Sequence, residues 1–518
     1  MSAAVSQLEP PGRARPFSMT VEFVTPEDTE PFETAIKPAL ELAARFHQDR
    51  RLTGLSVTDR VRSEHDHDPS AVARRIFEVS GQQPIVHLAG KNREVDDLVR
   101  SLEWMQAHDL TRALIITGDR VKSEPPGGRT RYLESVPAIW TAKQRWPTLT
   151  VAAAICPFKY REEECLSQYL KLGKKIRAGA DYLITQIGYD MWKFQELIWW
   201  CVRRGYEAPL VANLMPLTAP RGRYIRTNRI PGITITDSLQ ELLEEEAREP
   251  DKGRRRAFRR LALQIIGVKR LGYAGVQFTA IHKWDGLEEV LRLVDDLEGE
   301  LALRGDWWLA WVDALTFKDR RVAQVAPPDG FDLFEIARDH LPDADLKAAP
   351  AARPLEAEAL SQEIRKYRML DMLDHWVFQQ GSPGARVLAS MLRRVPEGSL
   401  LDEILSRLEK ATKERIVGCQ ACGSCRLPHT FYVCPETCPK GLANGPCGGT
   451  TDNQCEFGDR ECIHNLKYRI AREAGALRDL EEVLIPAVPI ERRGSCSWTA
   501  HFKGQGPQAV RVEFRSKS

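Results

Sequence analysis

Short apolar runs rich in β-branched residues alternate with longer amphipathic stretches through about the first 298 residues of the chain. In the longer stretches, such as EVDDLVRSLEWMQAHD and LSQYLKLGKKIRAGA, apolar residues recur at positions i, i+3 and i+4, which is typical of surface helices. The short runs have the length and composition of buried strands. They are SMTVEFVTP, LTGLSVTD, QPIVHLAG, RALIITGD, TVAAAICP, DYLITQIG, PLVANLMP and YAGVQFTAI.

Eight strand–helix repeats in about 280 residues match a (β/α)8 TIM barrel in number and length. A doubly wound parallel sheet with extra strands has the same local signals but fits the number of repeats less well. We therefore predict an α/β fold with a (β/α)8 barrel over residues 18–298. Active sites of this fold lie at the carboxyl ends of the strands.

Polar residues lie within or at the end of every predicted strand. An exposed rim would also be polar, so the pattern alone is weak. Glu22 is more informative because it lies inside the apolar run TVEFV, where a buried carboxylate needs a partner, a proton or a substrate. Cys156 is more simply interpreted as a thiol packed in the core than as an active-site residue. The polar residues are Glu22, Thr58, Asp59, His87, Asp119, Cys156, Gln186, Asn213 and Thr279.

The composition changes after residue 298, where the strand–helix alternation ends. Helical patterns return in SQEIRKYRMLDMLDHWVFQ and LLDEILSRLEKATKERI, and PDADLKAAPAARPLE before them is the best candidate for a linker. The last residues are basic and are expected to form a tail. The predicted organisation is a disordered tail (1–17), the barrel (18–298), a connecting segment and linker (299–356), a helical and cysteine-rich metal-binding domain (357–490), and a second tail (491–518).

Eight of the 12 cysteines lie between residues 418 and 465. Three thiolates spaced by two residues can hold one face of an iron–sulfur cluster, and a remote cysteine before proline often supplies the fourth ligand. Thiolates with this spacing also suit tetrahedral zinc, with His429 or His464 as further candidates. The predicted metal ligands are Cys419, Cys422, Cys425, Cys434, Cys438, Cys447, Cys455 and Cys462.

Eight thiols are enough for two four-ligand sites, and the choice between zinc, a [4Fe–4S] cluster or one of each stays open. A segment this short cannot bury enough apolar area, so we expect metal to hold its fold. The glycines of NGPCGG let the backbone bend around Cys447 and aim its amides at sulfur.

Charge and hydropathy exclude some partners. The 74 basic and 72 acidic residues give a net charge of +2, which offers no bulk attraction to nucleic acid or to an anionic membrane. The longest apolar stretches have strand length, and the N-terminal stretch has no apolar core of a signal peptide. We therefore expect a cytoplasmic protein, in which clustered thiols bind metal and do not form disulfides.

Several motifs together resemble the methylenetetrahydrofolate reductase family. VEFVTP, VHLAG, TGD and KKIRAGADYLITQ, on the eight-strand frame, resemble its barrel over about residues 17–298. The pattern CxxCGxC…CPxxCPK…NGPCGG…CE resembles the cysteine-rich C-terminal domain found in some members, over about residues 357–475.

The resemblance implies an oxidoreductase of one-carbon metabolism, with a place in methionine biosynthesis. It implies that a bound flavin, FAD or FMN, exchanges a hydride with the folate one-carbon unit while Glu22 acts as general acid. Tetrahydrofolate derivatives would be the substrates, an electron-donor protein or NAD(P)H the partner, and a homo-oligomer the assembly. The implied folate-binding residues are Asp119 and Gln186, and the implied flavin-contacting residues are Thr58, His87, Gly118, Asp119 and Lys175.

The chain departs from the family pattern on the flavin side. The usual arginine before GD is Thr117, the segment CPFKYREEE replaces one that carries a histidine, and a helix aspartate is Gln168. These departures keep open a flavin-free folate-binding methyltransferase or one-carbon partner protein. A further alternative is a non-catalytic electron-transfer or docking module. Without the resemblance, His87 would be interpreted as a buried histidine whose hydrogen bonds are made within the core. Lys175 would be interpreted as a solvent-exposed residue of a helix.

Overall fold

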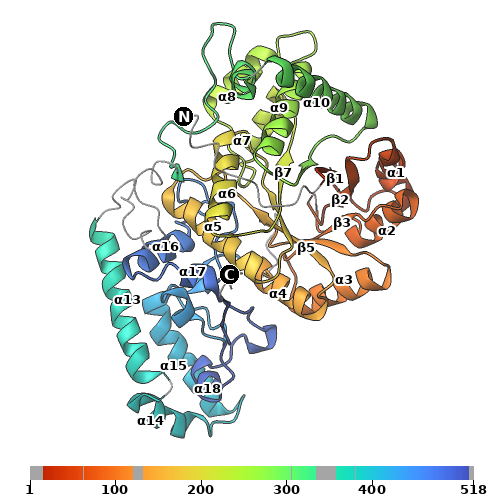
Figure 1. The fold of residues 1–518 in the computed structure, drawn as a ribbon. Coiled ribbons are helices and arrows are strands. Elements are labelled where there is room, and N and C mark those ends of the chain that lie inside the picture. Colours follow the sequence, from red (N-terminus) through yellow and green to blue (C-terminus); the bar gives the residue numbers. More distant parts are fainter. Residues whose placement is uncertain are drawn as a thin grey trace.

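The computed structural model describes residues 16–61, 63–120, 132–304, 306–333, 357–379 and 381–512. Its N-terminal part is a closed barrel of eight strands in the order of the sequence, with every neighbouring pair parallel (Figure 1). The predicted α/β barrel is therefore confirmed. The strands are β1 (Ser18–Phe23), β2 (Leu52–Val57), β3 (Ile85–Ala89), β4 (Arg112–Ile116), β5 (Thr150–Ile155), β6 (Tyr182–Thr185), β7 (Leu210–Leu214) and β8 (Gly275–Phe278).

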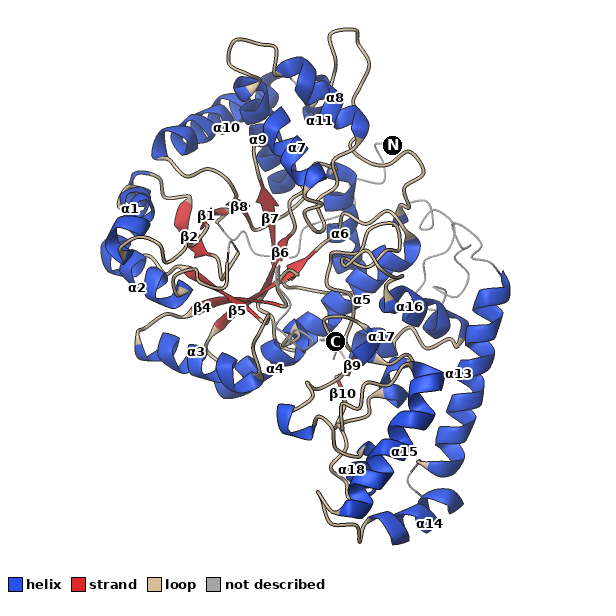
Figure 2. Ribbon diagram, turned by 180° about the vertical axis from the view of Figure 1, so that it is seen from behind, coloured by secondary structure: helices blue, strands red, loops and turns tan. Residues whose placement is uncertain are grey.

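Helices surround the strands in an outer layer (Figure 2). Their buried faces and the outward faces of the strands form the main core. The helices are α1 (Phe32–Ala43), α2 (Pro69–Ser80), α3 (Val95–Ala107), α4 (Ser135–Arg145), α5 (Glu162–Arg177), α6 (Met191–Arg203), α7 (Ala219–Thr227), α8 (Asp237–Glu246), α9 (Arg254–Arg270), α10 (Trp284–Arg304) and α11 (Trp307–Asp313).

Local sequence signals explain where several helices begin and end. The Asp68 side chain accepts hydrogen bonds from the first backbone amides of α2, and Gly81 ends that helix in the left-handed conformation. Ser399 and Gly418 do the same for α15 (Leu400–Val417). The second of these signals places the end of α15 directly before the first cysteine.

The inside of the barrel has a small core of its own, separate from the main one. It is formed by Ile85, Leu114, Ala152, Ile184 and Val211. Because side chains alternate along a strand, residues two positions further toward the carboxyl end also point inward. This alternation places Glu22, Thr58, His87, Gly118, Cys156, Gln186, Asn213 and Thr279 on the inward side of the carboxyl mouth.

A cysteine-rich domain follows the barrel and lies beside α4 and α5 (Figures 1 and 2). Helices α16 and α17 pack directly on α5, whereas α13 to α15 lie further from the barrel. Its elements are α13 (Ala357–Val377), α14 (Pro383–Leu392), α15 (Leu400–Val417), α16 (Ile463–Glu473), α17 (Asp479–Glu482), β9 (Val483–Leu484), α18 (Ser497–Phe502) and β10 (Val510–Arg511), with short 3-10 helices at Leu427–Thr430, Pro435–Thr437 and Ile490–Arg492.

The structure describes only part of the predicted tails and linker. Residues 1–15, residues 334–356, which include all of the predicted linker PDADLKAAPAARPLE, and residues 513–518 lie outside the described residues. Residues 491–512 differ from a plain tail, because they contain α18 and the strand β10, which pairs with β9. Cys496 and Phe502 are buried there against the helical domain. These buried contacts are made with residues more than 80 positions earlier, so local composition could not reveal them.

Candidate functional site

Glu22 lies on the inward face of β1, beside polar side chains from the ends of β7 and β8. Gln277 Nε2 donates to Glu22 Oε2 at 3.2 Å. Thr279 Oγ1 lies 3.2 Å from Glu22 Oε1 and 2.8 Å from Asn213 Oδ1. We call these four residues the Glu22 cluster. Within the described residues, Gln277 Oε1 is buried without a hydrogen-bond partner, so it can accept from a ligand or a water.

The surroundings of Glu22 favour its protonated form. Burial raises the pKa of Glu22 to about 7, against the opposing hydrogen bonds from Thr279 and Gln277. The Thr279 hydroxyl carries one hydrogen, so when it donates to Asn213 its oxygen can accept a hydrogen bond from the protonated Glu22 carboxyl group. A carboxylic acid that holds its proton near neutral pH can give that proton to a bound substrate.

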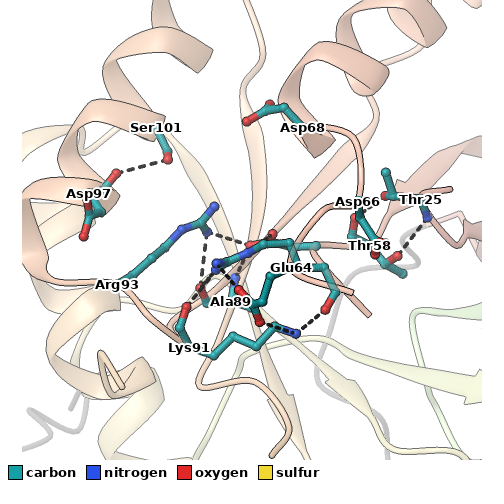
Figure 3. Close-up of polar contacts among 12 residues, drawn as sticks. Thr25, Thr58, Glu64, Asp66, Asp68, Ala89, Lys91, Arg93, Asp97 and Ser101 are labelled. Carbon is teal, nitrogen blue, oxygen red and sulfur yellow. Dashed lines mark hydrogen bonds and ion pairs between the residues drawn. The ribbon is translucent and has the colours of Figure 1, made fainter. Parts of the chain in front are cut away.

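Thr58 and His87 lie on the β2–β3 side of the same mouth, and both are buried. Thr58 Oγ1 accepts from the Thr25 amide at 3.1 Å, and the Thr25 hydroxyl donates to the Thr58 carbonyl oxygen (Figure 3). His87 Nε2 lies 2.6 Å from Ser56 Oγ. Burial lowers the pKa of His87 to about 4, so its ring is neutral at physiological pH. Contact of these two residues with a flavin stays a prediction.

Ion pairs tie the loops after β2 and β3 together (Figure 3). The Asp59 carboxylate pairs with Arg93 Nη1 at 2.6 Å and with Arg60 Nε at 3.1 Å. Glu64 pairs with Arg60 at 2.9 Å and with Lys91 at 3.4 Å. These ion pairs hold the two loops against each other on the β2–β3 side of the mouth.

The end of β4 is in contact with the cysteine-rich domain. Lys440 Nζ donates to the Gly118 carbonyl oxygen at 2.8 Å and pairs with Glu456 Oε2 at 2.6 Å. The Arg120 amide donates to Glu456 Oε1 at 2.8 Å. Although Asp119 keeps some exposure, burial of its carboxyl group raises its pKa, and Lys440 opposes that rise. Lys440 therefore connects the end of β4 to the second domain.

Gln186 and Lys175 both have hydrogen-bond partners inside the protein. Gln186 Nε2 donates to the Pro231 carbonyl oxygen at 2.9 Å, and its Oε1 accepts from the Ile187 amide at 2.8 Å. Lys175 Nζ donates to the Ala154 carbonyl oxygen at 2.5 Å. Burial lowers the pKa of Lys175 to about 7. Lys175 is thus buried against β5, unlike the solvated helix residue considered as its alternative.

Residues 444–450, which we call the Cys447 loop, hold the cysteine-rich domain against α5. Glu134 accepts from the Asn444 amide at 3.1 Å and from Asn444 Nδ2 at 2.9 Å. Lys171 Nζ lies 3.0 Å from Glu134 and donates to the Gly445 carbonyl oxygen at 2.8 Å. Gly445 has a φ of +145°, and a Cβ there would come within 3.0 Å of the Lys171 side chain. Only glycine fits this approach without displacing the lysine.

We expect Glu134→Gln to loosen this interface. Burial alone would raise the pKa of Glu134, but Lys171 and Asn444 outweigh it and hold the value at about 2. The neutral amide would leave Lys171 without its counter-charge and would turn an NH2 group toward an amide donor. Breaking a buried pair in this way costs about 3 kcal/mol. Hydrogen exchange of residues 443–450 is the measurement, and protection equal to wild type would contradict the expectation.

The same pair predicts an acid-sensitive interface. Because the folded pKa of Glu134 lies below its ordinary value near 4.5, its stabilising contribution is complete above that value. The contribution is then lost as pH falls toward about 2.

The eight clustered cysteines fall into two sets of four, each with mutual electrostatic contact. Cys434 interacts with Cys419, Cys422 and Cys425, and these four surround one small cavity. We call them set one. Set two consists of Cys438, Cys447, Cys455 and Cys462, which interact with one another. All eight are free thiols, as expected.

Burial raises the pKa of six of the eight thiols, which favours their neutral form, but hydrogen-bond donors that would stabilise a thiolate lie near both sets. The Ala421 amide lies 3.4 Å from Cys419 Sγ, and the Gly449 amide lies 3.5 Å from Cys447 Sγ. Lys413 Nζ lies 3.5 Å from Cys425 Sγ. In the described part of the chain, no three His, Cys, Asp or Glu side chains are yet arranged as ligands of one ion, so metal binding stays a prediction.

The cysteine-rich pattern contains Lys440 and Glu456 but gives them no partner, and the sequence did not single out Glu134 or Lys171. Each acts across a separation of 270 to 340 residues, and each alone reads as an ordinary surface charge. The one local signal was the NGPCGG motif, whose glycines indicated a close approach of the backbone.

Comparison with known proteins identifies two regions. Residues 9–294 match the family profile described as methylenetetrahydrofolate reductase. Residues 399–489 match a second profile, described as the C terminal of methylene-tetrahydrofolate reductase. In the described residues, no helix has the length and apolar character needed to cross a membrane.

Individual relatives are distant. A methylenetetrahydrofolate reductase (NADH) from Arabidopsis thaliana is 25% identical over 174 residues, covering 29% of this chain and 28% of that protein. A probable methylenetetrahydrofolate reductase (NADPH) from Caenorhabditis elegans is 21% identical, covering 34% of this chain and 26% of that protein. The matches thus span about a quarter to a third of each relative's length.

Among solved structures, a protein from Clostridium thermocellum that binds two copies of 5-methyl-5,6,7,8-tetrahydrofolic acid is similar over 55% of this chain and 96% of its own. The TM-score is 0.41 and the sequence identity is 14%.

Proposed function

Because the chain belongs to the methylenetetrahydrofolate reductase family, we propose that it interconverts 5,10-methylenetetrahydrofolate and 5-methyltetrahydrofolate at the mouth of its barrel. The observation that carries this proposal is Glu22, a carboxyl group held on the inward face of β1 with its pKa raised to about 7. Asp119 and Gln186, which the resemblance assigns to folate, lie at the ends of β4 and β6 on the same mouth.

Glu22 supplies the proton that the reaction needs. When it protonates a nitrogen of the five-membered ring of methylenetetrahydrofolate, the ring opens to an iminium ion, whose carbon accepts a hydride and becomes the methyl group. Thr279 and Gln277 fix the carboxyl group, and Asn213 holds the Thr279 hydroxyl in place. In the reverse direction the ionised Glu22 takes the proton back.

The pH dependence of turnover tests this role. Glu22 must be protonated to act as the acid, so kcat/KM for reduction of the methylene substrate should be level below pH 7 and fall tenfold per pH unit above it. The oxidation of methyltetrahydrofolate should show the opposite slope. A kcat/KM that does not change between pH 6 and 9, approximately the range in which such an acid titrates, would contradict the assignment.

A cleft of about 840 Å³ with several basic residues in its lining lies beyond the ends of β7 and β8. Ala280, which follows Thr279, lines it together with Arg221, Arg254 and Lys283. Folates carry glutamate carboxylates at the end away from the pterin ring. We therefore propose that this cleft receives the acidic end of the substrate.

The reductant comes from outside the chain. We propose NAD(P)H or an electron-donor protein as its source, in line with the NADH and NADPH in the names of the relatives. A flavin, FAD or FMN, is the carrier implied by the resemblance, but the Cys447 loop lies close to Cys156 and Gln168 on the side of the mouth where the resemblance would place it. This contact favours the second candidate function, a flavin-free enzyme or partner protein of one-carbon metabolism.

We further propose that sets one and two each hold zinc or a [4Fe–4S] cluster. Four thiolates, amides aimed at sulfur and a nearby lysine suit either group. A bound metal would fix the fold of the cysteine-rich domain. A homo-oligomer in the cytoplasm is the expected assembly and location.

A further inference from the structure

The flavin side of the barrel mouth is in contact with the chain's own second domain. After β4, Lys440 Nζ donates a hydrogen bond to the Gly118 carbonyl oxygen, and the Arg120 amide donates one to Glu456. On the segment after β5, the Lys159 ammonium group donates to the Thr450 carbonyl oxygen. The second domain therefore hydrogen-bonds the backbone after β4 and a lysine side chain from the segment after β5.

The Cys447 loop continues this contact toward β6. A Cβ on Gly448 would lie 3.5 Å from Cys156 Cβ and 3.9 Å from Gln168 Nε2. On the far side, a Cβ on Gly232 would meet the Gly448 carbonyl oxygen at 3.1 Å and Gln186 Cγ at 3.3 Å. The loop backbone at Gly448 therefore lies close to Cys156, which follows β5, to Gln168 of α5 and to Gly232 before α8 (Asp237–Glu246).

The departures from the family pattern coincide with this contact. Cys156, Lys159 and Gln168 all differ from the flavin-side pattern; Lys159 donates a hydrogen bond to the Cys447 loop, and the other two lie close to Gly448. Glu164, in the same altered segment, accepts from the Asn453 amide at 2.6 Å. The departures after β5 thus lie beside the second domain, whereas the departure at Thr117 accepts from the Ser135 amide within the barrel.

We propose that the Cys447 loop and a flavin are mutually exclusive occupants of the β4–β6 side of the mouth, and that the docked loop keeps flavin out. The Glu22 cluster lies on β1, β7 and β8, whereas Asp119 and Gln186 lie on the side of the mouth that the second domain contacts. Flavin exclusion is measured by binding alone, so the inference does not depend on turnover. Release of the loop is the event that would open this side.

The anchor of the loop gives a direct way to shift the balance. Glu134 and Lys171 hold Asn444 and Gly445, but neither touches the inward face of the strands. If the loop leaves the site open in only a small fraction of molecules, the apparent Kd for flavin equals the intrinsic Kd divided by that fraction. Weakening the anchor enlarges the fraction and tightens flavin binding.

The experiment titrates the full-length protein with FAD and with FMN, followed by flavin fluorescence, beside a calorimetric titration with 5-methyltetrahydrofolate. We expect wild type to bind flavin with an apparent Kd above about 100 μM, and Glu134→Gln to tighten it at least tenfold. The Glu22 cluster is unchanged in this variant, so the calorimetric titration should still detect folate binding. The matched control is Glu246→Gln, which breaks an equally buried pair with Arg260 away from the interface and should leave flavin binding as in wild type.

Three results would overturn the proposal. One is stoichiometric flavin binding by wild type with unchanged hydrogen exchange at residues 443–450. Another is equally weak flavin binding by wild type and by Glu134→Gln, which would locate the defect in the barrel itself. The last is an equal gain in the Glu246→Gln control. If Glu134→Gln does not fold, Lys440→Ala, which frees the Gly118 carbonyl oxygen, replaces it with the same expectations.

Discussion

Glu22→Gln should lower turnover of methylenetetrahydrofolate by at least about 100-fold while folate still binds with an affinity close to that of wild type. The amide keeps the shape of the side chain and its contacts with Thr279 and Gln277, but it has no acidic proton to give. The loss should therefore fall on kcat. Stopped-flow or steady-state kinetics measure turnover, and calorimetry with 5-methyltetrahydrofolate measures binding.

The matched control is Glu64→Gln, the same substitution on the same mouth. Glu64 pairs with Arg60 and Lys91 in the β2–β3 network and does not reach the Glu22 cluster, so this variant should keep activity within about threefold. Equal activity of Glu22→Gln and wild type would mean that Glu22 is not the acid. Loss of folate binding in Glu22→Gln would instead assign it to substrate binding.

Cys422→Ser and Cys447→Ser should each remove the metal of one set and leave the other set loaded. Cys422 belongs to set one and Cys447 to set two, so each variant should contain about half of the wild-type metal. Because metal holds the fold here, each variant should lose protection in its own part of residues 418–465. Cys447→Ser should also release the Cys447 loop from the barrel.

The spectrum distinguishes the two metals. Loss of folding without a change in absorbance would indicate zinc, whereas loss of a broad visible band would indicate an iron–sulfur cluster. Cys201→Ser is the control, since Cys201 is a buried thiol of α6 and should leave the metal content unchanged. If Cys422→Ser stays folded and fully loaded, the assignment of Cys422 as a ligand is wrong.

The barrel and the position of Glu22 were predictable because they depend on local patterns. Strand-length runs separated by amphipathic helices determine the fold, and the alternation along β1 places Glu22 inside. Its elevated pKa follows from that burial. The eight cysteines were equally visible, because their spacing repeats over a few residues.

The division of the cysteines and the docking of the second domain were not predictable. Cys434 and Cys438 both precede proline, and only the folded chain assigns them to different sets. Lys440 and Glu134 find their partners across more than 300 residues. The sequence did show that residues 156–168 depart from the family, but the reason, contact with the Cys447 loop, is a tertiary one.

We propose above all that this chain reduces methylenetetrahydrofolate to 5-methyltetrahydrofolate, with Glu22 as the acid whose proton opens the five-membered ring. The most direct test is anaerobic incubation of the metal-loaded, full-length protein with NADH and methylenetetrahydrofolate labelled with ¹³C in the one-carbon unit. Carbon NMR then follows the label. The account predicts a growing methyl signal with wild type and none above background with Glu22→Gln. A methyl signal that grows equally with both proteins would contradict this account. So would the absence of a methyl signal with wild-type protein that binds folate, when NADH and then a reduced electron-donor protein are supplied.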